Sequence, residues 1–74
     1  MEDYIINVGE IEELQTIKDI QSLNTIFDRA KRNIVGGGTA VLVRKQLSGR
    51  SDKFDELSTL DDLKNYKDKV YKYL

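Results

Sequence analysis

The chain has 74 residues, of which 39% are hydrophobic and 34% are charged, and it contains no cysteine and no histidine. Such a composition is typical of one folded domain, and it excludes a disulfide framework, a thiol nucleophile and most structural zinc sites. The formal net charge is only −1, but the charges are segregated: residues 1–28 include seven acids and one base, whereas residues 29–53 include seven bases and one acid.

The first predicted element is a short strand over residues 4–8, in which Tyr4 and Ile6 fall on one side and which ends at Gly9. The next segment is harder to assign. Residues 10–17 have an apolar residue at every third position, a spacing that drifts around a helix by about 60° per step. We therefore predict a loop or a second short strand there.

An amphipathic helix is predicted to follow and to reach residue 34. Its apolar residues fall within an arc of about 120° on a helical wheel, and they are Ile20, Leu23, Ile26, Phe27, Ala30 and Ile34. Thr16 and Asp19 have the spacing of a capping box and mark a candidate start. The three glycines at 36–38 are predicted to end the helix and reverse the chain, which requires at least one of them at positive φ.

Residues 39–43 are apolar on both faces and rich in β-branched side chains, which predicts a central strand that continues to Leu47. Such a strand is too apolar to be left beside water. A loop over residues 48–52 is predicted to follow. We expect Phe54 and Leu57 to pack this loop against the core.

The last predicted element is a helix that begins near residue 60. Its apolar face consists of Leu60, Leu63, Tyr66, Val70 and Leu74. Thr59 is a suitable N-cap, with Asp62 three residues further on. Together these elements predict a small single α+β domain over residues 1–74, in the order strand, helix, strand, helix. The sheet would have two to three strands, with helices packed on one face.

Length and hydropathy also constrain location and assembly. No apolar run approaches the ~20 residues that a membrane-spanning helix needs, and the acidic start of the chain is unlike a signal peptide. We therefore expect a cytoplasmic protein without membrane contact, complete as given because it opens on Met1. A chain of this length buries only ~60% of the surface that its unfolded form exposes, so we expect oligomerisation to add stability.

Catalysis finds little support in these residue types. Without histidine or cysteine, a general base would have to be a carboxylate, lysine or tyrosine with a shifted pKa. Adjacent acids such as Asp61 and Asp62 diverge by ~100° on a helix and cannot share a proton. The glycines at 36–38 follow a helix instead of preceding one, so they do not form a phosphate loop. We predict a non-enzymatic protein with no catalytic residue, no cofactor and no metal.

The strongest candidate binding feature is a basic patch of five residues, Arg29, Arg32, Arg44, Lys45 and Arg50. If the end of the predicted helix meets the end of the predicted strand, these cations could contact phosphates or an acidic partner. An isoelectric point of about 5.3 and the lack of interleaved aromatic residues argue against nucleic acid. The competing interpretation is that acidic and basic surfaces meet each other, within one chain or between copies.

Two tyrosines near the C-terminus are a candidate interface. Tyr71 and Tyr73 flank the apolar face of the last predicted helix, and tyrosine is enriched where proteins meet. The alternative is a frayed, partly exposed end.

The sequence as a whole predicts an interaction or regulatory module that binds a protein partner of unknown identity and forms a homodimer. The alternative function is nucleic-acid binding through the basic patch in residues 29–53.

Overall fold

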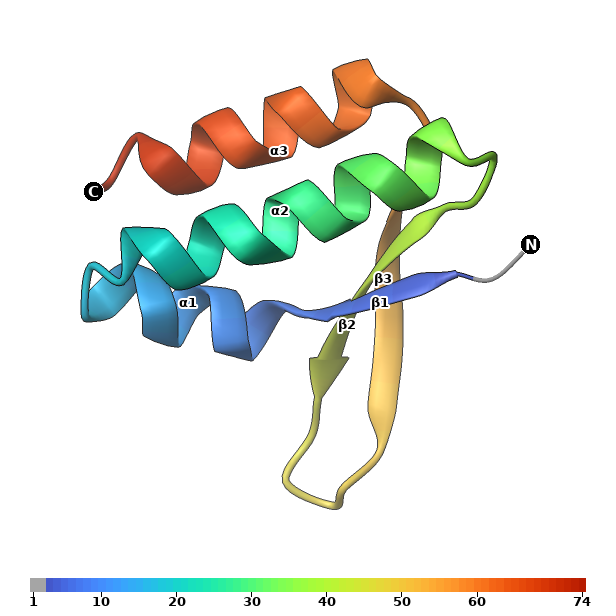
Figure 1. Cartoon of the computed structure of the whole chain (residues 1–74). Helices are drawn as coiled ribbons and strands as arrows, with labels where there is room; N and C mark the ends of the chain where they lie inside the picture. The colour runs from blue at the N-terminus through green and yellow to red at the C-terminus, as the bar shows by residue number, and fades with distance from the viewer. Residues whose placement is uncertain (1–2) are drawn as a thin grey trace.

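The structure, a computed structural model, describes residues 3–74, which form three helices and a three-stranded mixed sheet (Figure 1). In chain order the elements are β1 (Tyr4–Asn7), α1 (Val8–Thr16), α2 (Ile20–Val35), β2 (Ala40–Lys45), β3 (Ser51–Leu57) and α3 (Leu60–Tyr71). The predicted α+β class, the central strand and the sheet with helices on one face are confirmed, but the central strand β2 ends at Lys45 and not at Leu47, which lies in the turn. None of the three helices is long and apolar enough to cross a membrane.

The sheet has the strand order β1-β2-β3. β1 and β2 are parallel, with Tyr4 opposite Ala40, so the chain must cross from one to the other through α1 and α2. β3 then runs antiparallel to β2, and the register shifts between Leu42 and Val43. β2 is thus hydrogen-bonded on both sides, while β1 and β3 are edges.

The core lies between the sheet and the helices. Strands contribute Ile6, Leu42 and Leu57 to it, each no more than 4% exposed. The helices contribute Val8, Ile11, Leu23, Phe27, Ala30, Ile34, Leu63 and Val70. The predicted stripe of the second helix is therefore confirmed over most of its length, although Ile20 at its start is 49% exposed.

The prediction of a loop or strand over residues 10–17 is wrong, because this segment belongs to α1. Asn7 caps the helix, and its Oδ1 accepts a hydrogen bond from the Gly9 N–H at 2.9 Å. Val8 and Ile11 supply the buried face, three residues apart. The apolar stripe therefore begins inside the segment that had been assigned to the strand, and Gly9 lies within the helix instead of ending an element.

The boundary between α1 and α2 also differs from the predicted capping box at Thr16. Thr16 is the last residue of α1, where its hydroxyl donates to the Glu12 carbonyl at 2.8 Å. α2 is instead capped by Asp19, which accepts from the Ser22 N–H at 3.1 Å. Lys18 joins the two helices with a positive φ of 56°.

The glycine turn after α2 follows the prediction. Gly37 has a φ of 94°, and its N–H donates to the Ile34 carbonyl, while the Gly38 N–H donates to the Asn33 carbonyl. This pair of hydrogen bonds is a Schellman motif, which satisfies carbonyls left open at the helix end. The predicted cap of the last helix is confirmed as well, since Thr59 Oγ1 accepts from the Asp62 N–H at 3.1 Å.

β3 is a strand that the sequence did not predict. Of its residues only Leu57 is buried, as predicted, whereas Phe54 is 55% exposed and does not pack against the core. The register shift explains the difference, because Asp55 pairs with Leu42 and Lys53 with Val43, leaving Phe54 as an extra residue between two paired ones. Such a bulge turns a side chain away from the regular alternation.

Candidate interaction surface

The far end of the β2–β3 hairpin extends beyond the helices (Figure 1). Its turn is closed by a hydrogen bond from the Gly49 N–H to the Gln46 carbonyl at 2.9 Å. Gly49 has a φ of 89°, a conformation that favours glycine. The hairpin therefore has a defined end and not a loose loop.

This end of the hairpin exposes two large apolar side chains. Leu47 is fully exposed and Phe54 is 55% exposed. Together with the neighbouring polar side chains they line a shallow hollow formed by Arg44, Lys45, Gln46, Leu47, Ser48, Asp52 and Phe54. We call Arg44, Lys45, Leu47, Arg50 and Phe54 the hairpin patch. Exposed apolar side chains with a polar rim are typical of protein-binding surfaces.

Three of the five predicted basic-patch residues lie in the hairpin patch, and two do not. Arg44, Lys45 and Arg50 are in the hairpin, whereas Arg29 and Arg32 are in the second half of α2. Asn33 Nδ2 donates to the Thr39 carbonyl at 2.9 Å, which fixes the end of α2 at the beginning of β2.

Arg44 and Lys45 end β2 and are therefore four to five residues away from that junction, roughly 13–17 Å along the strand. The helix end thus meets the start of the strand and not its end. The five cations were predicted to form one surface only if the end of the helix met the end of the strand, and these two ends lie apart along β2.

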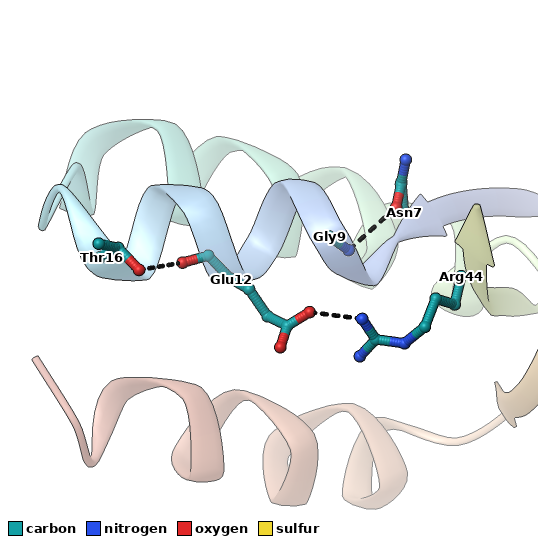
Figure 2. A network of polar contacts seen from close by, with 5 residues as sticks. All are labelled: Asn7, Gly9, Glu12, Thr16 and Arg44. Carbon is teal, nitrogen blue, oxygen red and sulfur yellow. Dashed lines mark hydrogen bonds and ion pairs between the residues drawn. The ribbon is translucent and has the colours of Figure 1, made fainter. Parts of the chain in front are cut away.

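Most cations of the hairpin already have an acidic partner. Arg44 Nη1 lies 2.8 Å from Glu12 Oε1 of α1 (Figure 2), and Arg50 Nε lies 3.1 Å from Asp52 Oδ1. Lys53 pairs with Glu56. Lys45 has no ion pair within residues 3–74. These pairs are all about half exposed or more, so each contributes only ~0–1 kcal/mol to stability.

The Glu12–Arg44 pair also joins the acidic and basic segments of the sequence. Glu12 extends from α1 toward the end of β2, and the two side chains meet in the space beside α3 (Figure 2). Both charges act on the pKa of the Tyr66 hydroxyl in α3. Burial raises the pKa of its hydroxyl, Glu12 raises that pKa further, and Arg44 opposes the rise.

The remaining predicted residues occupy other surfaces. Arg32 Nε lies 3.1 Å from Asp28 Oδ2 on the same helix, and Arg29 is exposed nearby. Tyr71 packs edge-on against Phe27 with ring centroids 5.8 Å apart, and its hydroxyl donates to Asn24. It therefore joins α3 to α2, which is a structural role.

Tyr73 is 72% exposed and lies beyond the end of α3. Its role as a partner contact stays a prediction. The sequence patterns did not identify Leu47 and Phe54 as site residues. One signal was present for Leu47, because it is an apolar residue directly before a predicted turn, where the chain is usually exposed.

A second hollow lies between α2 and α3. Of its three apolar lining residues, Phe27 and Leu63 are only 2% and 5% exposed, whereas Leu60 is 45% exposed. Lysines and aspartates both line it, so it favours neither sign of charge. Within residues 3–74 no group of three or more His, Cys, Asp or Glu side chains is placed to bind a metal ion.

Comparison of the chain with protein-family models, with curated proteins and with solved structures found no match.

Proposed function

We propose that the protein is a small non-enzymatic interaction module, acting in the cytoplasm, that binds a protein partner through the hairpin patch. The observation that supports this proposal most is that Leu47 and Phe54 are both exposed and line the same hollow on one projecting hairpin. Large apolar side chains that enter a partner provide most of the affinity in protein interfaces, while surrounding charges determine orientation. Arg44, Lys45 and Arg50 form such a rim, and Lys45, which takes part in no ion pair within residues 3–74, supplies a positive charge that favours an acidic contact.

The burial of the central strand within one chain changes where a surface for self-association can lie. The sequence argument for a dimer began from an apolar central strand that needed cover. In the structure Ala40, Val41 and Leu42 are each no more than 6% exposed within a single chain. Any apolar contact between copies must therefore come from exposed residues elsewhere, such as Leu47 and Phe54 of the hairpin.

Nucleic-acid binding is the weaker candidate. A phosphate contact would have to compete with the carboxylates that already pair with Arg44 and Arg50. The separation of Arg29 and Arg32 from the hairpin also reduces the number of cations available to one strand of phosphates. No feature of the described residues favours this function over a protein partner.

Site-specific photo-crosslinking tests the proposal. A photoreactive benzoylphenylalanine is placed at position 47 and, as a matched control, at Val35, which is 67% exposed but lies at the end of α2. In extracts of the cells that make the protein, position 47 should give discrete adducts that excess unmodified chain suppresses. Excess chain with Leu47→Ser and Phe54→Ser should not suppress them. Adducts equal at both positions, or none at position 47, would contradict the proposal.

A further inference from the structure

Two further large apolar side chains are exposed near the junction of α1 and α2. Ile17 is 63% exposed and Ile20 is 49% exposed. The Ile17 N–H donates to the Glu13 carbonyl at 3.1 Å. The side chains of Glu13 and Ile17 are therefore one helical turn apart, and both are exposed. Glu10 lies three residues before Glu13, on a neighbouring row. We call Glu10, Glu13, Ile17 and Ile20 the acidic corner.

The acidic corner and the hairpin patch have complementary chemistry. Each presents two exposed apolar side chains, and each has more charges of one sign: the acidic corner has the exposed Glu10 and Glu13 with Lys18 in the junction, whereas the hairpin patch has Arg44, Lys45 and Arg50. Within residues 3–74, neither Glu10 nor Glu13 nor Lys45 takes part in an ion pair. Both surfaces therefore have charges of opposite sign that are available to each other.

We propose that the hairpin patch binds the acidic corner of a second copy of this chain. This inference rests on the proposed function, because it names the partner and the surface that receives the hairpin. The ion pair between Glu12 and Arg44 joins the same two segments within one chain. Leu47 and Ile17 nevertheless both stay exposed, so the apolar residues are left for another molecule.

A two-fold axis lets one pair of chains satisfy both surfaces. Each copy inserts its hairpin patch at the acidic corner of the other, so residue 45 of one chain faces residue 13 of its partner, and the same contact occurs twice. No hairpin or corner then remains open, and the assembly stops at two. A head-to-tail arrangement would instead leave one surface of each kind open in a pair, and it would add further chains to form a ring or a filament.

A charge exchange between two variants tests this arrangement. Lys45→Glu and Glu13→Lys each place like charges opposite one another in both contacts of a homodimer. A mixed pair of the two variants restores opposite charges in both contacts. In sedimentation velocity at micromolar concentration, wild type should be dimeric, each variant alone should dimerise about tenfold more weakly or worse, and an equimolar mixture should regain the dimer.

Two controls make the outcome specific. Lys64→Glu changes the net charge by the same amount on exposed α3 and should leave the wild-type dimer intact. Leu47→Ser should weaken the dimer at any salt concentration, with an unchanged circular dichroism spectrum. Recovery in the mixture shows at the same time that both charge variants are folded.

Three results would overturn the inference: a monomeric wild type, a mixture no more associated than its components, or species that grow beyond two chains. The crosslinking at position 47 then separates this failure from that of the proposed function. Adducts with other proteins only would leave the interaction module standing with a different partner. A missing adduct from position 47 would remove both.

Discussion

Tyr66 of α3 lies close to residues from both other helices and from the sheet. Its ring lies 5.8 Å from that of Phe27, centroid to centroid, and its side chain is half-buried. The hydroxyl feels Glu12 from α1 and Arg44 from β2. Because burial is the larger cause of its raised pKa, the neutral phenol is the form that the folded protein prefers.

A raised tyrosine pKa predicts a loss of stability at alkaline pH. The unfolded tyrosine loses its proton near pH 10, while the folded one still holds it, so the unfolded state binds fewer protons over that interval. Stability is then fully present below about pH 10 and falls as the pH rises through the higher folded value. Thermal melts from pH 8 to 11 should show a smaller alkaline loss for Tyr66→Phe than for wild type.

Tyr73→Phe is the matched control for this experiment, since Tyr73 is 72% exposed. Its melting curve should follow that of wild type over the whole range. Parallel alkaline losses in wild type and Tyr66→Phe would show that another group, such as Tyr71 with its own pKa raised by burial, determines the effect.

At the scale of the elements, α3 packs onto the core through two buried side chains, Leu63 and Val70. Leu63 is 5% exposed beneath the helix, whereas Leu60, one turn earlier, is 45% exposed. Leu63→Ala should lower the free energy of unfolding by ~2–5 kcal/mol, because it removes buried surface and leaves a cavity. Leu60→Ala should cost much less. Urea titrations of both variants measure the difference, and similar midpoints would mean that α3 docks through other residues.

The elements also show which structure a sequence pattern can reveal. α2 and α3 were predictable because each has an apolar stripe of helical period, but only the cap of α3 was predicted at the right residue. α1 was missed because it follows β1 without a loop, and its first buried residue, Val8, had been assigned to the strand. β3 was missed for a different reason: Asp52, Lys53, Asp55 and Glu56 show no apolar alternation, since the strand is held by pairing with β2.

The candidate site was predictable only in part for the same reason. Arg44, Lys45 and Arg50 were recognisable as cations, but the partner of Arg44 is Glu12, 32 positions away in the sequence. This contact forms only because the chain crosses from β1 to β2 through α1 and α2, and no short sequence pattern predicts that crossover. The exposure of Phe54 depends on a bulge and was equally hidden.

At the scale of the whole molecule, folding reduces the charge segregation seen along the sequence. The pair between Glu12 and Arg44 places acid from the first third beside base from the second, and the hairpin adds two further pairs of its own. Folding therefore places an acid beside a base at these three positions.

This charge pattern predicts weak or no binding to generic duplex DNA. Fluorescence anisotropy with a labelled duplex should show no saturable binding at ~50 mM salt, because a phosphate-driven complex needs several free cations on one surface. Saturable binding whose affinity falls steeply with salt, by a log–log slope of ~0.9 for each phosphate contacted, would instead restore the nucleic-acid function. Arg44→Gln and Lys45→Gln would then reduce that slope.

The parallel pairing of β1 with β2 also sets the order in which the chain can fold. During synthesis β1 leaves the ribosome first, yet its partner strand is made only after α1 and α2 are complete. β2 and β3 are neighbours in sequence and can pair as soon as both emerge, whereas closing β1 onto β2 requires a long loop to be ordered first. We therefore expect β1, although it is made before β2 and β3, to be the last strand to join the sheet.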